Sequence, residues 1–362
     1  MEYILFLTYR CNLNCKYCFA KNLVHNYKTN QATLNSDNIE QLCKYIENDI
    51  IKNNRTDNSI VFFGGEPSLV PEIISKIIQK TSHLKLNYSI YTNGLLLDKL
   101  PDELLMRLQT ILVAIDGDVN CHELYKPKGS YDLIIDKVKS IRNRTNAQII
   151  ARITMEEQTN IDLSVINLLK HFDFVHWQIV NKDSFEDAPK LIDNYRRNIR
   201  SLFNRWKQSL RDGNVLNIIP FNRIVYYIIS NNESTSFKCG CGTSIQAIDI
   251  EGNIYLCDEY IEDRCNSVAN IYDQNYDAIN YKNHFELFED CTTCKISQIC
   301  SGRCRKCLET QSANQIRVYC ELTKILINMI HDSIEDIRNI ITVNKINLNT
   351  LCSEIYNTEI IP

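Results

Sequence analysis

Six short apolar runs in the first half of the chain constrain the fold more than any other feature of this sequence. They cover residues 3–8, 59–63, 86–92, 110–116, 148–154 and 174–180, and helix-like segments separate them. Continuous hydrophobic runs of this length are typical of parallel strands that are buried on both faces. Such strands, joined by helices through right-handed crossovers, curl into a barrel or part of one. The sequence therefore predicts an α/β fold with a partial (β/α)6 TIM-like barrel.

Helical stripes organise the segments outside these runs. The first stripe comprises Ile39, Leu42, Cys43, Ile46 and Ile50. Ser36 is its predicted N-cap, and Cys43 is interpreted as a core residue. A second stripe, assigned to packing, comprises Leu191, Tyr195, Ile199, Leu202, Phe203 and Trp206, and a last amphipathic helix carries Leu322, Ile325, Met329 and Ile337. The predicted domains are the barrel over 1–185, a helical connector over 186–237, a cysteine-rich domain over 238–322, and a C-terminal helix and tail over 323–362.

Charge and hydropathy exclude two classes of partner. Forty Lys and Arg residues against forty-four Asp and Glu residues give a formal net charge of -4, which argues against electrostatic binding of nucleic acid. No apolar run is long enough to cross a membrane. The N-terminal sequence lacks the apolar length and the cleavage site of a secretory signal. We therefore expect a soluble protein of the reducing cytoplasm, with no nucleic-acid or membrane partner.

The sixteen cysteines need an explanation other than disulfides, because thiols of a cytoplasmic protein stay reduced and usually serve metals or catalysis. Three lie at Cys11, Cys15 and Cys18, and ten lie between Cys239 and Cys320. The remaining cysteines, Cys43, Cys121 and Cys352, stand alone. The first group follows the first predicted strand, and a Gly-Gly-Glu-Pro segment follows the second. Both therefore fall where barrel chemistry is expected, at the carboxyl ends of strands.

Three clustered cysteines fit an iron–sulfur cluster better than a structural zinc site. Structural zinc takes four closed ligands, and no fourth lies beside Cys11, Cys15 and Cys18. A cubane cluster has one outer ligand position on each iron, so three thiolates leave one iron open. An iron atom with a free ligand position can bind a reactant, so it is a candidate reaction site.

At these residues the sequence resembles the radical S-adenosylmethionine (SAM) superfamily. Its signature is Cys-x3-Cys-x2-Cys after the first barrel strand, as in Cys11, Cys15 and Cys18. The family's other motifs follow in order: Gly64-Gly65-Glu66-Pro67, Thr92-Asn93-Gly94, Ile115-Asp116-Gly117 and Arg152-Ile153-Thr154. The resemblance implies that the three cysteines bind a [4Fe–4S] cluster, whose open iron is chelated by the amino and carboxylate groups of SAM.

The resemblance also implies roles for the residues around SAM. The ring of Tyr17 is expected near the adenine. Gly64 and Gly65 lack side chains and let the backbone approach the methionyl amino group. Glu66 is expected to shape this site, with a helix cap as the alternative.

Three further positions complete the implied SAM site. Arg152 suits the methionyl carboxylate, with a surface ion pair as the alternative. Asn93 and Asp116 either position the ribose or close turns. Many relatives carry a serine where this chain has Ala114, so that contact with SAM is not carried over.

The later cysteines resemble the SPASM extension of radical SAM enzymes. Residues 246–250 and 253–257 predict a hairpin that turns at Glu251-Gly252 and brings Cys239 or Cys241 near Cys257. By resemblance, one auxiliary [4Fe–4S] cluster would be bound by Cys239, Cys241, Cys257 and Cys304. The other would be bound by Cys291, Cys294, Cys300 and Cys320, which makes three clusters in all.

Zinc ribbons are the alternative to these clusters, and whether Cys239 and Cys241 both bind stays open. Cys265 and Cys307 lie outside the SPASM motif and are interpreted as buried or spare thiols.

The implied activity is reductive cleavage of SAM to a 5′-deoxyadenosyl radical, which abstracts hydrogen from a peptide or protein. Enzymes with both auxiliary clusters install thioethers and other crosslinks, or oxidise Cys or Ser. Asp258 follows Cys257 directly, as an aspartate does in the similar anaerobic sulfatase-maturating enzymes, where it resembles a general base; a solvated loop carboxylate is the alternative. That match is partial, because those enzymes precede Gly-Gly-Glu with glutamine and this chain has Phe63.

The expected partners are the peptide or protein substrate and an electron donor such as flavodoxin or ferredoxin. The first strand begins almost at Met1, so we expect no N-terminal leader-binding domain, and recognition is direct or uses a separate leader-peptide recognition protein. The alternatives are a radical SAM enzyme that acts on a small molecule, and a non-catalytic metal-binding or redox module.

Overall fold

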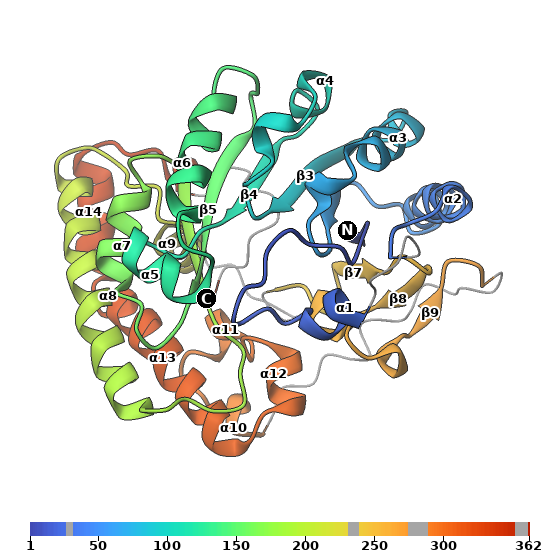
Figure 1. Cartoon of the computed structure of the whole chain (residues 1–362). Helices are drawn as coiled ribbons and strands as arrows, with labels where there is room; N and C mark the ends of the chain where they lie inside the picture. The colour runs from blue at the N-terminus through green and yellow to red at the C-terminus, as the bar shows by residue number, and fades with distance from the viewer. Residues whose placement is uncertain (27–31, 231–238, 274–288, 352–360) are drawn as a thin grey trace. The chain divides into compact units, whose positions relative to one another are not determined.

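All six predicted strands form in the computed structural model, which describes residues 1–26, 32–230, 239–273, 289–351 and 361–362 (Figure 1). They are β1 Glu2–Phe6, β2 Asn58–Phe63, β3 Leu86–Thr92, β4 Thr110–Ala114, β5 Gln148–Met155 and β6 Phe174–Ile179. β1 pairs with β2, β2 with β3, β3 with β4, and β5 with β6, always in parallel. The predicted α/β class with a parallel sheet is thus confirmed.

The chain forms two compact units. The first comprises Met1–Ala114, Tyr125–Ile149 and Gly240–Phe285. The second comprises Ile115–Leu124, Ile150–Cys239 and Glu286–Pro362. Among the cysteines, Cys352 lies outside the described residues.

In the first unit, a hairpin from late in the chain extends the sheet beside β1. β7 Ile245–Ile248 and β8 Asn253–Tyr255 form the predicted hairpin, and β9 Ala269–Asn270 pairs with β8. β7 also pairs with β1 in parallel, which gives the order β4-β3-β2-β1-β7-β8-β9. The sequence did not predict this last pairing. β1 is therefore an interior strand, paired on both sides.

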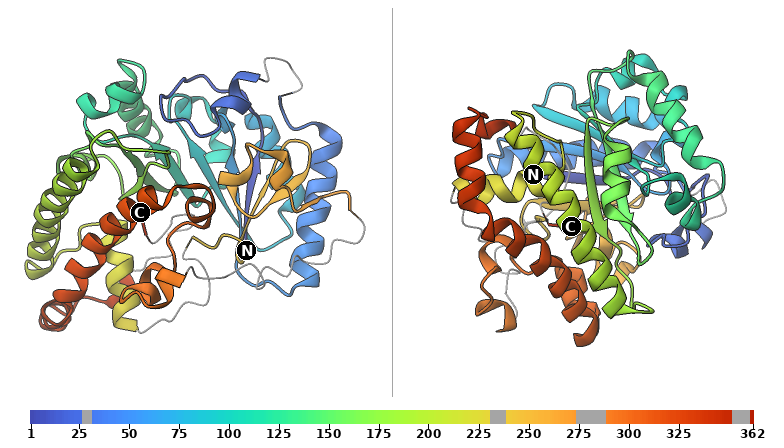
Figure 2. Two further views of the ribbon diagram at one scale, coloured as in Figure 1. Left: turned by 90° about the horizontal axis from the view of Figure 1, so that it is seen from below. Right: turned by 90° about the vertical axis from the view of Figure 1, so that its left-hand side faces the viewer.

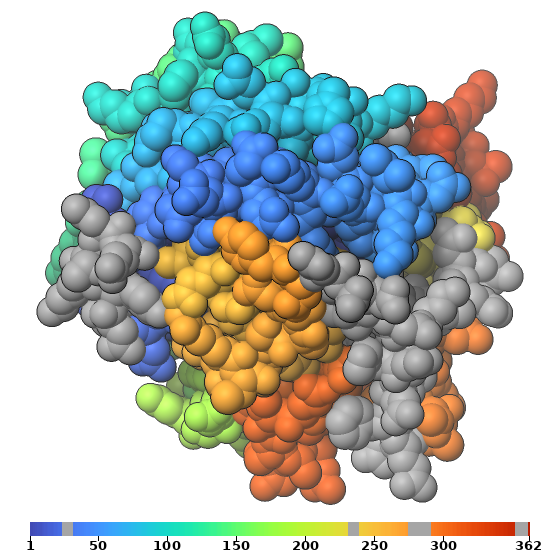
Figure 3. Space-filling view, turned by 90° about the vertical axis from the view of Figure 1, so that its right-hand side faces the viewer, coloured from blue at the N-terminus to red at the C-terminus, as the bar shows by residue number. Residues whose placement is uncertain are grey.

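Helix α2 Ser36–Lys52 packs against this hairpin. The Tyr45 hydroxyl donates to Gln246 Oε1 at 2.7 Å, and Asn38 Nδ2 donates to the carbonyl of Ile250 at 2.7 Å. Figure 3 shows the two segments side by side on the surface, α2 in blue and the hairpin region in yellow and orange. Cys43 is buried, as predicted. The predicted N-cap is wrong by one residue, because Asn35, not Ser36, accepts the hydrogen bond that caps the helix.

The other helices of the first unit complete its α/β layers. They are α1 Lys21–Asn26, α3 Pro71–Thr81, α4 Asp102–Leu105 and α6 Ser130–Ile141. The apolar face of α3 is buried through Ile73, Ile74, Ile77 and Ile78.

The second unit combines β5 and β6 with several helices. They are α7 Ile161–Leu168, α8 Ala188–Arg211, α9 Ile219–Ser230, α13 Ala313–Asp332 and α14 Ile334–Val343, and α5 Val119–Tyr125 begins in this unit. Of these helices, α7 and α9 contact β6. The stripe predicted on α8 is buried, and α8 lies beside α13 and α14 (Figure 2). The predicted last helix is two helices, because the chain departs from helical geometry at Ser333. Short helices α10 Glu289–Thr292, α11 Ser297–Cys300 and α12 Arg305–Thr310 carry the later cysteines.

None of the helices described is both long and apolar enough to span a bilayer.

Candidate functional site

The first three cysteines lie on the loop that joins β1 to α1. Cys11, Cys15 and Cys18 are each half-buried. Burial raises the pKa of Cys11 to about 12, and the nearby Glu66 carboxylate and the other two thiols act in the same direction. The amide of Leu13 donates to Cys11 Sγ at 3.4 Å and opposes this shift. The Cys11 thiol is therefore protonated near neutral pH until a metal displaces the proton.

The donor set suits a cluster rather than a single ion. Among the described residues, no group of three or more His, Cys, Asp or Glu side chains is placed to hold one metal ion. A four-iron cluster requires a different arrangement, because each thiolate binds its own iron at a separate corner of the cube. Three thiols on one half-buried loop fit that requirement.

The glycines after β2 let that loop contact the cysteine loop closely. The amide of Gly65 donates to the Thr8 carbonyl at 2.7 Å, and the amide of Glu66 donates to the Arg10 carbonyl at 2.8 Å. A Cβ on Gly65 would lie 2.3 Å from the Arg10 carbonyl oxygen, and one on Gly64 would lie 2.4 Å from that of Thr8. Only glycine fits at either position. Both glycines are expected to approach SAM, and in the structure they also lie against the backbone that leads into Cys11.

Glu66 joins the loops that follow β2 and β3. Its side chain is fully buried. Oε1 accepts from the Ser68 amide at 3.0 Å and from the Thr92 hydroxyl at 2.7 Å, and Oε2 accepts from the Asn93 amide at 2.8 Å. Burial raises the pKa of the Glu66 carboxyl, and these donors act against that shift. Glu66 thus caps the turn at Ser68 and also fixes the shape of the site.

Asn93 connects the third loop to the cysteines. Its Nδ2 donates to Asn12 Oδ1 at 2.7 Å, and its Oδ1 accepts from the Leu95 amide at 3.1 Å. Asn12 lies between Cys11 and Cys15 and was not predicted as a site residue. Its place inside the Cys-x3-Cys motif was the available signal. The loops after β1, β2 and β3 are therefore held together in the first unit.

Tyr17 packs against another segment of the first unit. Its ring centroid lies 5.9 Å from that of Tyr125, and Lys126 Nζ lies 5.8 Å from the Tyr17 centroid. The Lys16 amide donates to the Tyr125 carbonyl at 3.0 Å. These contacts hold the side chain of Tyr17, the residue that directly precedes Cys18.

Two predicted SAM-site residues belong to the second unit. Arg152 is half-buried on β5, where its register partner on β6 is His176. Asp116 Oδ1 accepts from the Thr154 amide at 2.9 Å, and the Asp116 amide donates to His122 Nδ1 at 3.1 Å. Both contacts of Asp116 lie within the second unit.

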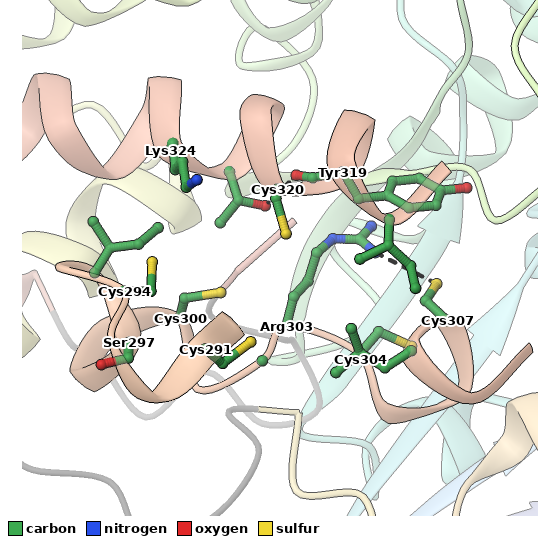
Figure 4. A pocket seen from close by; sticks show the side chains of 15 residues that line it. Cys291, Cys294, Ser297, Cys300, Arg303, Cys304, Cys307, Tyr319, Cys320 and Lys324 are labelled. Carbon is green, nitrogen blue, oxygen red and sulfur yellow. Dashed lines mark hydrogen bonds between the residues drawn. The ribbon is translucent and has the colours of Figure 1, made fainter. Parts of the chain in front are cut away.

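Six later cysteines line one cavity in the second unit, which we call the cysteine cavity (Figure 4). It is lined by Cys291, Cys294, Ile296, Ser297, Cys300, Gly302, Arg303, Cys304, Cys307, Leu308, Ile316, Tyr319, Cys320, Thr323 and Lys324. Burial raises the pKa of Cys300 to about 12, and the thiols of Cys320, Cys291 and Cys294 contribute. The four predicted ligands of one auxiliary cluster are thus brought together.

The four cysteines predicted for the other auxiliary cluster divide between the units. Cys241 and Cys257 belong to the first unit and are buried, and the Gly242 amide donates to the Leu256 carbonyl at 3.3 Å. Cys239 and Cys304 belong to the second unit. A hydrogen bond with Cys307 and burial raise the pKa of Cys304, and the Cys239 thiol acts in the same direction.

The two surplus cysteines differ in environment. Cys265 is exposed. Cys307 is buried and lines the cysteine cavity, as expected of a buried thiol outside the motif.

Asp258 begins the short turn that directly follows Cys257 in the first unit, and it is half-buried. The segment after it approaches the cysteine loop. Burial raises the pKa of Cys18, and the Glu262 carboxylate acts in the same direction.

Comparison with known families identifies the N-terminal part of the chain. Residues 5–169 match the sequence model of the radical SAM superfamily. The chain contains a radical SAM domain. Radical SAM domains use SAM and a [4Fe–4S] cluster, so these are the cofactors of the matched domain.

The similarity to curated relatives extends over most of the chain. A cysteine-type anaerobic sulfatase-maturating enzyme of Clostridium perfringens is 25% identical over 347 residues, 87% of this chain and 91% of that protein. The radical SAM cyclopropyl synthase TigE of Paramaledivibacter caminithermalis is 26% identical over 360 residues, 89% of this chain and 72% of that protein.

Solved structures share the radical SAM fold. The enzyme anSMEcpe with bound AdoMet superposes with a TM-score of 0.76 at 20% identity, over 97% of both chains. Streptococcus suis SuiB bound to precursor peptide SuiA superposes with a TM-score of 0.58 at 17% identity, over 84% of this chain and 71% of that one. The predicted fold class is confirmed as an α/β fold with a parallel sheet of radical SAM type, and the cysteine-rich C-terminal region fits the predicted SPASM extension.

Proposed function

We propose that this radical SAM enzyme abstracts hydrogen from a peptide or protein and thereby installs a thioether or other crosslink, or oxidises a Cys or Ser side chain. With its cofactors bound, the site supplies a 5′-deoxyadenosyl radical from SAM. The names of the relatives support a peptide substrate, because they include sulfatase-maturating enzymes and a complex with a precursor peptide. The observation that carries the proposal is the joining of three strand-end loops around Cys11, Cys15 and Cys18.

The proposed first-cluster ligands are these three cysteines. Gly64 and Gly65 set the backbone close to the methionyl group, and Glu66 and Asn93 keep the surrounding loops in place through the contacts described above. The aromatic ring of Tyr17 contacts the adenine, and the guanidinium of Arg152 binds the methionyl carboxylate through two hydrogen bonds. A well-oriented substrate in a site that excludes water limits reaction to the intended carbon.

Two auxiliary [4Fe–4S] clusters complete the proposal. One set of ligands is Cys291, Cys294, Cys300 and Cys320, and the other is Cys239, Cys241, Cys257 and Cys304. The lining of the cysteine cavity supports the first set, because six cysteines and no Asp or Glu side chain line it. Reduction requires an external electron donor, and we propose a flavodoxin or ferredoxin of the cytoplasm. A separate protein that recognises a leader peptide is the proposed second partner.

Anaerobic turnover tests this function. Purified, reconstituted protein with SAM and dithionite is expected to release 5′-deoxyadenosine and to contain iron and sulfide but no stoichiometric zinc. Peptides encoded beside the gene are then added, and mass spectrometry measures a change in peptide mass. If no 5′-deoxyadenosine forms, the enzyme proposal is wrong, and the non-catalytic metal-binding or redox module is the remaining alternative. Its formation with modification of a small molecule, and of no peptide, would favour the small-molecule alternative.

Asp258 is proposed as the general base that takes a proton from the substrate. We expect D258N to lower peptide modification at least about a hundredfold, since positioned general bases contribute that much. The same variant is expected to keep forming 5′-deoxyadenosine, because the base acts on the substrate and not on SAM. Mass spectrometry of the peptide and chromatography of the nucleoside measure the two separately. E259Q, which changes the neighbouring carboxylate, is the matched control, and full peptide modification by D258N would remove the assignment.

A further inference from the structure

Lys126 is a buried cation at the carboxyl edge of the sheet in the first unit. Only 5% of its surface is exposed, although a lysine is rarely buried so deeply unless its charged group is paired. Its Nζ donates to the carbonyl of Ala114, the last residue of β4, at 2.7 Å. Because β1 to β4 run in parallel, the cysteine loop after β1 starts from the same edge of the sheet. Lys126 is therefore anchored at the edge where the predicted SAM site lies.

The ammonium group of Lys126 also lies near the ring of Tyr17. Its Nζ is 5.8 Å from the ring centroid, within the distance at which a cation is attracted to an aromatic ring. Such an attraction is stronger when the cation is shielded from water, as it is here. Lys126 thus connects the Tyr17 ring to the end of β4.

Tyr125 precedes Lys126 and contacts the same part of the cysteine loop. The Lys16 amide donates to the Tyr125 carbonyl at 3.0 Å. The rings of Tyr125 and Tyr17 are tilted by 48°, with their centroids 5.9 Å apart. A backbone hydrogen bond, a ring contact and a charged group therefore meet at residues 16 and 17. Both rings are half-buried, so the Tyr17 ring is held in place and keeps exposed surface for a ligand.

A ring that is fixed in advance favours SAM binding. A side chain that moves freely before binding loses conformational entropy when a ligand orders it, and this loss lowers the affinity. The ring of Tyr17 is the group that we expect to contact the adenine. Contacts that hold this ring therefore raise the affinity for SAM without touching SAM.

We propose that Lys126 is a positioning residue for SAM, because it fixes the Tyr17 ring from the end of β4 and thereby sets the place of the adenine. This inference rests on the proposed function, in which Tyr17 contacts the adenine. Lys126 acts through the ring, and the step transfers no bond, proton or electron.

SAM binding to the anaerobic, reconstituted full chain tests the proposal. Equilibrium dialysis of radiolabelled SAM measures the dissociation constant while the cluster is oxidised and SAM stays intact, and iron and sulfide are determined in each sample. We expect K126M, which keeps the length of the side chain and removes its charge, to raise the dissociation constant about tenfold. The matched control is K128M, which removes an exposed lysine two positions away and is expected to change the dissociation constant less than about twofold.

A double-mutant cycle with Tyr17 separates positioning from a general structural effect. Y17L removes the aromatic ring and is also expected to raise the dissociation constant about tenfold, because base–aromatic stacking is lost. In the Y17L background, K126M is expected to add less than about twofold, since no ring is left to position. Independent effects would instead multiply to about a hundredfold, and that outcome would overturn the proposal.

A second substitution serves if K126M does not retain its iron. K126Q keeps a hydrogen-bond donor and removes the charge, and we expect it to raise the dissociation constant about fivefold, again only when Tyr17 is present. Loss of iron from both K126M and K126Q, with K128M intact, would make Lys126 a residue for folding and would overturn the proposal.

The outcomes also separate this inference from the proposed function. A parent protein that holds iron but does not bind SAM would contradict the proposed function itself. Unchanged SAM binding by Y17L would remove the contact with the adenine and, with it, the role of Lys126. Weaker binding by Y17L together with unchanged binding by K126M would overturn the role of Lys126 alone.

Discussion

Replacing Cys15 by alanine reduces the formation of 5′-deoxyadenosine from SAM to the level without enzyme. Two thiolates on the loop after β1 hold a cubane cluster poorly, and without that cluster SAM is neither bound through iron nor reduced. The auxiliary ligands are untouched, so iron content falls by about one third if three equal clusters are present. Chromatography of the nucleoside and a colorimetric iron determination measure the two effects on the same anaerobic sample.

C265A is the matched control for this variant. Cys265 is exposed and lies outside every predicted ligand set, so its removal deletes one thiol without deleting a ligand. We expect full iron content and full 5′-deoxyadenosine formation. Equal losses in C15A and C265A would contradict the assignment of the first cluster, and so would full activity of C15A.

Replacing Gly65 by alanine weakens both the fold and the binding of SAM. The added Cβ would lie 2.3 Å from the Arg10 carbonyl oxygen, and the neighbouring Arg10 and Tyr9 backbone atoms lie at 2.7 and 2.8 Å. These are backbone atoms, so no rotamer change relieves the overlap. Overpacking of this kind costs about 1–3 kcal/mol, and displacement of the loop before Cys11 is expected to lower SAM affinity at least about tenfold. Chemical denaturation measures the first effect, and the SAM-induced change in the spectrum of the reduced cluster measures the second.

G129A separates this steric effect from the general cost of replacing glycine. Gly129 has φ +79°, and a Cβ there would have nothing within 4 Å. Alanine at this position is expected to cost about 1 kcal/mol through backbone conformation, with SAM affinity unchanged. If G65A binds SAM as tightly as the parent protein does, the close contact between the two loops is not required for the site.

The six strands were predictable because most of their residues are buried, so that each strand is a mostly apolar run. β3 was predicted as residues 86–92 and spans Leu86–Thr92. Helix ends were predicted less well, because capping depends on which side chain reaches the first amides. Asn35 does so at the start of α2, although Ser36 beside it is an equally good capping residue type.

The features that escaped prediction are contacts between residues distant in the sequence. The pairing of β7 with β1 leaves no periodic signal in either segment, and the bond between Asn93 and Asn12 joins residues 81 positions apart. Spacing within the motifs predicts which cysteines group together, but it says little about the residues between them.

The pairing of β7 with β1 joins a strand that is synthesised late to the first strand of the chain. Glu2 is aligned with Ile245, so one edge of β1 stays unpaired on the ribosome until most of the chain has been synthesised. Contacts between such distant segments form slowly, and an open strand edge invites aggregation in the meantime. We therefore expect the nascent chain to depend on chaperones, and iron to be inserted only after translation has passed the hairpin.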